Sequence, residues 1–229
     1  MNPASPPTPG DPREQPATGV RAAFAGDGFS VKDAVGGPRG ILESALPTLV
    51  FVILFMITRS AMVAGGGAMA AVAALLLARI VQRQPVTMVL GGMIAAVLSA
   101  VIAMRSGSGS NFYLLGIVQN AAAALVVLGS VLLGHPLVGY LAGALDARVA
   151  RWRSIPAARR TYRSATLVFG GLFALKTAVQ GTLYLQDATD ALGVAKLLLG
   201  LPAFALVVFL TFLMHRALIS SLGLGNHRE

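Results

Sequence analysis

The chain has no cysteine, and only nine of its 229 residues are aspartate or glutamate. The missing thiol excludes disulfides, thiolate nucleophiles and sulfur-ligated metal clusters. Charge is scarce as well, since 12% of the residues are charged while 55% are hydrophobic and the mean hydropathy is +0.74. These values lie outside the range of ordinary globular domains and indicate a membrane protein.

Signatures of catalysis and of metal binding are also missing. The sequence has no phosphate loop ending in Gly-Lys-Ser/Thr, no His-Glu-x-x-His and no Gly-x-Ser-x-Gly. Its histidines, His135, His215 and His227, lie at the boundaries of apolar segments or in the tail, and Asp187 and Asp190 alone supply too few metal ligands. We therefore expect no catalytic residue, no metal, no cofactor and no enzymatic activity.

A long apolar stretch runs from about Leu46 to Leu218, interrupted by short arginine clusters. Several of its runs approach the ~20 residues that a helix needs to cross the hydrocarbon core of a bilayer. We predict an all-α, polytopic membrane helix bundle that forms one domain over residues 41–221. Its six transmembrane helices are expected at about 41–58, 61–81, 86–104, 112–133, 164–185 and 192–219.

Both ends of the chain differ from this domain. Residues 1–40 are rich in proline, glycine and alanine and lack the apolar core and cleavage site of a signal peptide. They are predicted to form a disordered cytoplasmic arm with a short interfacial helix over residues 29–35. Residues 222–229 are predicted to form a cytoplasmic tail.

The distribution of basic residues predicts the orientation. Arginine is concentrated in the loop between the second and third spans and in the loop between the fourth and fifth. Because basic loops stay on the cytoplasmic side, both termini are expected to be cytoplasmic in a bacterial plasma membrane. The net charge of +9 arises largely from these loops, so no nucleic-acid partner is expected.

The basic loop after the fourth span holds an apolar segment, 135–147, that is too short to cross. We predict a helix at the inner interface, with Tyr140 and Trp152 near the level of the lipid headgroups. The arginines of this loop are candidates for contact with anionic lipid headgroups or with another envelope membrane protein. These candidates are Arg148, Arg151, Arg153, Arg159 and Arg160.

Several short motifs occur in a characteristic order. They include Arg83-Gln84-Pro85, Pro136-Leu137-Val138-Gly139 and Gly200-Leu201-Pro202. In this order the chain resembles the actinobacterial membrane family of domain of unknown function 3159, over nearly everything after the arm. More distantly it is similar to the intracellular septation protein A family of inner-membrane proteins. The resemblance implies a membrane fold and a link to cell division and envelope synthesis, but no reaction.

Polar residues inside the predicted spans are the candidate functional site. Lys176 lies in the middle of the fifth span, where a charged side chain costs at least ~2.5 kcal/mol on insertion scales. Gln180 is four residues on and shares its helix face. One interpretation is an ion or anion site with Gln119 and Asn120 of the fourth span as neighbours; the other is hydrogen bonding between helices. Lys196 is predicted to be an interfacial anchor near the outer end of the sixth span; the alternative is that it faces Asp187 or Asp190.

Two functions follow from these observations. The first is a non-enzymatic protein associated with the envelope or with cell division, which predicts a dry, close-packed bundle and a partner at the basic loop. The alternative is a small-solute or ion transporter, which predicts that Lys176, Gln180, Gln119 and Asn120 line one aqueous cavity. The sequence favours the first narrowly.

Overall fold

The computed structural model describes residues 37–83 and 87–224, with side chains over 45–83 and 90–224. Every regular element within these residues is helical, which confirms the all-α prediction. The elements are α3 (Gly37–Thr58), α4 (Ala61–Val81), α5 (Thr87–Ser106), α6 (Asn111–Leu132), α7 (Leu137–Leu145), η2 (Ala147–Val149), η3 (Trp152–Ser154), α8 (Pro156–Leu185), α9 (Thr189–Leu199) and α10 (Leu201–Ser221).

These helices correspond to the predicted spans. Four segments of the described chain are long and apolar enough to cross a membrane, namely α4, α6, α8 and the stretch Thr189–Ser221 that contains α9 and α10. In α3 and α5 the parts whose side chains are described, Ala45–Thr58 and Leu90–Ser106, are apolar as well. The bundle is therefore that of a membrane protein, and the count of six spans stays a prediction.

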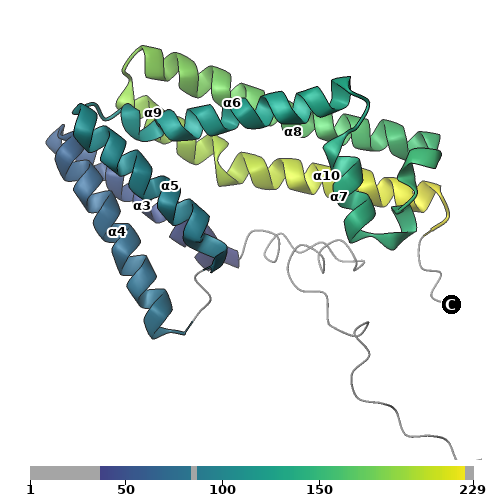
Figure 1. Ribbon diagram of the computed structural model, residues 1–229, viewed down its shortest axis with the longest axis horizontal. Coiled ribbons are helices and arrows are strands. Elements are labelled where there is room, and N and C mark those ends of the chain that lie inside the picture. Colours follow the sequence, from purple (N-terminus) through teal and green to yellow (C-terminus); the bar gives the residue numbers. More distant parts are fainter. Residues whose placement is uncertain (1–36, 84–86, 225–229) are drawn as a thin grey trace, which may run out of the picture.

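The helices form two groups (Figure 1). α3, α4 and α5 pack together in one group, and α6, α8, α9 and α10 form the other. The groups touch where α5 packs on α6 and where α3 packs on α9. We call the end that holds the turns after α3, α5 and α8 the Asp190 end. The other ends of the two groups lie apart in Figure 1. They are the end of α4 in the first group, and α7 with the end of α10 beside the second, and we call them together the Arg79 end.

Two apolar cores hold the bundle, one toward each end. The first gathers Phe51, Phe112, Tyr113 and Leu192, and so joins α3, α6 and α9. The rings of Phe51 and Phe112 are stacked with their centroids 3.8 Å apart. The second core joins α7, α8 and α10 around side chains such as Trp152 and Tyr162. Contact between the two helix groups is therefore densest at the Asp190 end.

The predicted interfacial segment is the short helix α7. It follows the end of α6, where Gly134 has a positive φ of 72° and its amide donates to the carbonyl of Val131. The amide of His135 donates to Ser130 at 2.8 Å, so α6 ends in a Schellman motif. Tyr140 is partly exposed, as expected for an interfacial residue, but Trp152 is 4% exposed and packs inside the protein. Burial against Tyr140 and Tyr162 is the physical reason for this difference.

The sixth predicted span is interrupted. α9 ends at Leu199 and α10 starts at Leu201, with Gly200 between them at φ −71° and ψ −115°. Pro202 has no amide hydrogen and cannot continue the hydrogen-bond ladder of α9. A Cβ on residue 200 would lie 2.5 Å from the carbonyl oxygen of Lys196, so glycine is required at the break. The expectation of one continuous helix over residues 192–219 is thus corrected.

Some predictions fall on parts of the chain outside the described residues. They include the short helix at 29–35 and all but the last four residues of the predicted arm, 1–40. The helix α3 already begins at Gly37, before the predicted boundary at residue 41. At the other end α10 stops at Ser221, where the predicted tail begins.

Candidate functional site

A cavity of about 490 Å³ lies between the two helix groups. We call it the central cavity. Its walls come from α3, α4, α5, α6, α8 and α9, together with the break at Gly200. Its polar lining residues are Thr48, Arg79, Ser99, Gln119, Asn120, Lys176, Gln180 and Lys196. The four residues that the sequence singled out inside the spans therefore line one space.

Lys176 and Gln180 enter the cavity from one face of α8. Both are buried within the protein, with 8% and 4% of their surface exposed. The ammonium group of Lys176 lies 5.7 Å from the ring centroid of Phe173 and 5.9 Å from that of Phe204. Such contacts stabilise a cation where water is scarce. Lys176 therefore does not face lipid.

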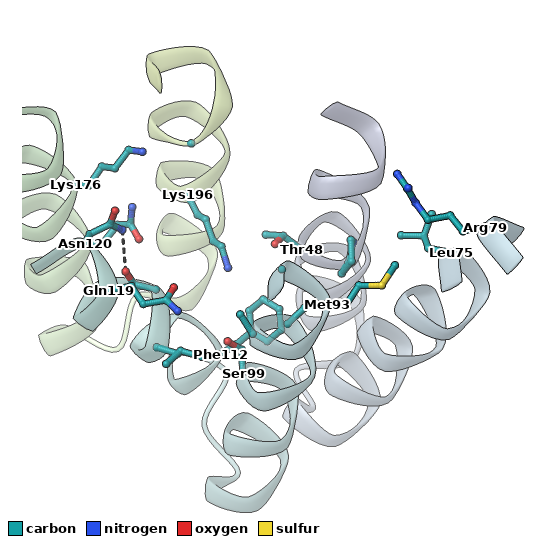
Figure 2. Close-up of a pocket in the computed structure, with 18 residues that line it drawn as sticks. Thr48, Leu75, Arg79, Met93, Ser99, Phe112, Gln119, Asn120, Lys176 and Lys196 are labelled. Carbon is teal, nitrogen blue, oxygen red and sulfur yellow. Dashed lines mark hydrogen bonds between the residues drawn. The ribbon is translucent and has the colours of Figure 1, made fainter. Parts of the chain in front are cut away.

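Lys196 reaches the cavity from α9. Figure 2 shows its side chain extending into the space between Gln119 and Thr48. Its ammonium group lies 4.8 Å from the ring centroid of Phe112 and 5.3 Å from that of Tyr113. The sequence predicted an interfacial anchor at this position, and the structure corrects it: the interruption after Leu199 and the packing of α9 on α3 turn Lys196 inward.

The amides of α6 form part of the same wall. Asn120 is half-buried and its Nδ2 donates to the carbonyl of Gly116 at 2.8 Å, one turn earlier on α6 (Figure 2). No group of the described residues donates a hydrogen bond to its amide oxygen. Gln119 is more exposed and projects toward the centre of the cavity. Both residues can offer hydrogen bonds to a bound solute.

Within the described residues, the charged side chains that line the central cavity are all basic, namely Arg79, Lys176 and Lys196. The carboxylates with described side chains are Asp146, Asp187 and Asp190, and each bonds a group outside the cavity. The other acidic residues of the sequence precede residue 44 or end the chain. Among the described side chains, no carboxylate therefore neutralises Lys176 or Lys196.

The Asp190 end of the bundle is closed by polar contacts. Arg59, in the turn after α3, forms an ion pair of 2.7 Å with Asp190 at the start of α9. Ser110, just before α6, donates to Asp187 at 2.6 Å and lies 2.8 Å from the hydroxyl of Thr189. Beneath these contacts lies the aromatic core around Phe51 and Phe112. The cavity lining, in contrast, continues along α4 as far as Arg79.

The predicted headgroup contacts lie in three different surroundings. Arg153, Arg159 and Arg160 line one pocket near the start of α8, together with Arg163. Arg151 is exposed and does not line this pocket. Arg148 instead binds the buried Asp146, with its Nη2 2.9 Å from Oδ2 of that carboxylate. The loop arginines therefore do not act as one surface.

Asp146 also anchors a buried network that joins three helices. His215 of α10 lies with Nε2 3.1 Å from Oδ2 of Asp146, and its Nδ1 is 3.0 Å from the hydroxyl of Tyr162 on α8. Burial in itself raises the pKa of Asp146, but the hydrogen bonds from Arg148, with a smaller contribution from His215, outweigh burial and hold this pKa below its ordinary value. Asp146 is thus ionised at neutral pH and accepts from both partners.

One family model matches the chain, over residues 35–221. Its description is protein of unknown function (DUF3159). The chain belongs to this family. No curated protein and no solved structure matches it. Membership of this family assigns no activity.

Two functional features of this family member were missed in the sequence. Lys196 was placed by its distance from the end of the span, although Gly200-Leu201-Pro202 signals an interrupted helix. The network of Asp146, Tyr162 and His215 gave no local signal, because its members lie far apart in the chain. Among the described side chains, over 45–83 and 90–224, no three of His, Asp or Glu gather as a metal site would require.

Proposed function

We propose that the protein is a multi-pass plasma-membrane transporter for a small organic anion, with the central cavity as its binding site. The observation that supports this most is the convergence of Lys176, Gln180 and Lys196 on one cavity of about 490 Å³. A scaffold whose only task is to present a surface has no need of such a space. A solute site needs both the volume and the convergent polar groups.

The charge balance favours an anion. A cation at membrane depth costs at least ~2.5 kcal/mol on insertion scales, and this cost is offset when the cation faces a counter-ion. No described carboxylate supplies that counter-ion to Lys176 or Lys196. A bound anion would supply it, with Gln180 and the amides of α6 as additional donors.

The interrupted helix favours transport over static binding. Gly200 lies eleven residues beyond Thr189, or about 16 Å at 1.5 Å per residue, and so near the middle of a ~30 Å hydrocarbon core. Lys176 is at a similar distance from the end of α8 at Leu185. In many transporters discontinuous helices bind the substrate near the midplane. The central cavity is closed at the Asp190 end, whereas its lining continues to Arg79 at the other. A transporter that works by alternating access is expected to be closed on one side in this way in each of its states.

The orientation and partners proposed here follow from the sequence. The Arg79 end is assigned to the cytoplasm because the basic loops lie there, and the arginines at this end contact anionic lipid headgroups. A non-enzymatic role in the cell envelope or in cell division, with other membrane proteins as partners, stays a prediction from the distant resemblance. That role predicts a close-packed bundle without an internal space, whereas this protein has the central cavity.

The first experiment measures anion binding to the purified protein in detergent. Acetate, succinate and glutamate serve as probes, and thermal unfolding reports binding because a ligand of the folded state raises the unfolding temperature. At least one probe should stabilise the wild type. Lys176→Met and Gln180→Leu should weaken binding about tenfold or more, the usual effect of losing a hydrogen bond to a charged group.

Arg216→Gln is the matched control, because it removes one positive charge from an exposed position outside the cavity. It should bind the probe as the wild type does. Lys176→Met should unfold at an equal or higher temperature without ligand, since a buried charge is replaced by an apolar side chain. The proposal fails if no anion stabilises the wild type, or if Lys176→Met and Arg216→Gln lose binding equally.

Transport is then measured in proteoliposomes with the best probe, radiolabelled. Wild type should accumulate the probe and Lys176→Met should not. In a strain that lacks the gene, the same variant should be present in the membrane fraction and fail to restore growth. Full rescue by both Lys176→Met and Gln180→Leu would assign these residues a structural role and redirect the search to partners of the loop 151–163.

A further inference from the structure

A second pocket, of about 720 Å³, lies at the Arg79 end of the second helix group. We call it the arginine pocket. It is bounded by the end of α6, the linker to α7, η3 and the first turns of α8. Its lining residues are Val131, Leu132, Gly134, Pro136, Trp152, Arg153, Pro156, Arg159, Arg160 and Arg163. It shares no lining residue with the central cavity.

The pocket is built on ordered elements. Arg159 and Arg163 are one helical turn apart on α8, and Arg160 is three residues before Arg163. Arg153 is held over the ring of Tyr140, with Cζ 5.4 Å from the ring centroid. Trp152, which carries the neighbouring wall, is buried against α7. The arginines therefore converge on one space.

The charge of the pocket is large and local. Four arginines line it, and the described carboxylates all bond elsewhere, Asp146 to Arg148, Asp187 to Ser110 and Asp190 to Arg59. Guanidinium groups donate in a planar fork that matches phosphate oxygens. We propose that the arginine pocket binds a membrane phospholipid whose headgroup carries two phosphates, of the diphosphatidylglycerol type.

The depth of the pocket selects a lipid over a soluble anion. The part of α8 from Ser164 to Leu185 is long enough to span the hydrocarbon core, so Pro156–Arg163 extends about 12 Å beyond it, to the level of the headgroups. On the membrane side, Leu132 and Leu133 end α6 with 88% and 77% of their surface exposed. A phospholipid fits both the basic and the apolar side of the pocket, because its phosphates can contact the arginines and its acyl chains can contact the exposed leucines.

The number of arginines selects two phosphates over one. A single phosphodiester carries one negative charge and would leave most of the positive charge of the pocket unbalanced. Two phosphates held on one glycerol bring two charges within reach of arginines from both η3 and α8. Basic pockets between helices at this membrane side are suited to such headgroups.

The test uses the full chain in detergent, titrated with diphosphatidylglycerol. Phosphatidylglycerol at equal phosphate concentration and inorganic pyrophosphate are the comparison probes. Thermal unfolding and native mass spectrometry report binding. Diphosphatidylglycerol should bind one site and stabilise the wild type more than either comparison probe. Arg159→Gln with Arg163→Gln should weaken this binding about thirty-fold, if each arginine contributes as basic residues near anionic membranes do.

Two matched variants separate a built site from general attraction. Arg151→Gln with Arg216→Gln removes the same charge from positions outside the pocket and should bind as the wild type does. Arg159→Lys with Arg163→Lys keeps the charge but loses the planar fork, and should bind more weakly than the wild type. Equal stabilisation by phosphatidylglycerol, equal losses in the two double glutamine variants, or tight binding of free pyrophosphate would overturn the proposal. None of these outcomes bears on the central cavity.

Discussion

The imidazole of His215 and the carboxylate of Asp146 meet inside the protein, with Nε2 and Oδ2 3.1 Å apart. Because a carboxylate only accepts hydrogen bonds, Nε2 of His215 is the donor. In the neutral imidazole Nδ1 then accepts from the hydroxyl of Tyr162, 3.0 Å away. The pair therefore ties the segment after α7 to α8 and α10.

Asp146→Asn should destabilise the protein by about 2 kcal/mol, in the range measured for hydrogen bonds to charged groups. The substitution keeps the shape of the side chain but removes the charge that Arg148 and His215 both bind. Thermal or denaturant unfolding in one detergent measures the change. Arg151→Gln, an exposed neighbour, is the control and should leave the unfolding midpoint where it is. An unchanged midpoint in Asp146→Asn would mean that the network is dispensable.

The contribution of Asp146 should also depend on pH. Its pKa in the folded protein lies below the ordinary value of 3.8, because hydrogen bonds from Arg148 outweigh the effect of burial. The ionised carboxylate therefore stabilises the fold at neutral pH, and this stability is lost as the pH falls below 3.8 through the lowered pKa.

The measurement is the difference in unfolding midpoint between wild type and Asp146→Asn, at pH 7 and in steps toward pH 3. The difference should be full at pH 7 and shrink at the acid end. Arg151→Gln should track the wild type throughout. A difference that stays constant over this range would show that the charge of Asp146 is not what stabilises the network.

Gly193→Ala should loosen the contact of α9 with α3. A Cβ at this position would lie 2.6 Å from Cγ2 of Val52 and 3.1 Å from the hydroxyl of Tyr113. Overpacking of this kind typically costs about 1–3 kcal/mol. Gly181→Ala is the matched helical control, because a Cβ there meets nothing within 4 Å. Thermal unfolding should fall for the first variant and be equal or higher for the second; equal falls in both would contradict close packing at Gly193.

The sequence predicted the helices well because apolar length is a local property. The span 61–81 matches α4 at both ends, and the short segment after α6 is a helix as expected. The break at Gly200 was missed because it lies in an otherwise apolar run, where hydropathy continues across it. Hydropathy alone cannot distinguish a continuous helix from two that meet at a glycine.

The candidate site was predictable only in part. Lys176 and Gln180 stand out in the sequence because charge and amide groups are rare inside a span. The direction in which Lys196 points depends on how α9 packs against α3, which is a tertiary property. Asp146 and His215 are 69 positions apart, and no periodic pattern in the sequence indicates that they pair.

A last prediction concerns the side from which the central cavity is reached. The chain has no cysteine, so a single introduced thiol is labelled uniquely. Gln119→Cys places it on the cavity wall, where residue 119 is exposed. If the Asp190 end is closed and the lining opens toward Arg79, a membrane-impermeant maleimide should label this thiol from the predicted cytoplasmic side and not from the opposite side.

Three control positions show which side of the membrane the reagent reaches and whether a buried thiol is labelled. Arg105→Cys, exposed at the Asp190 end, should be labelled from the outer side, and Ser220→Cys, exposed at the Arg79 end, from the cytoplasmic side. Ala124→Cys, buried in α6, should resist both. Labelling of Gln119→Cys from the outer side alone would reverse the direction of opening. If a stabilising anion slows labelling from the cytoplasmic side, the same space that admits the reagent also holds the solute, because both then compete for the wall that Gln119 shares with Lys196.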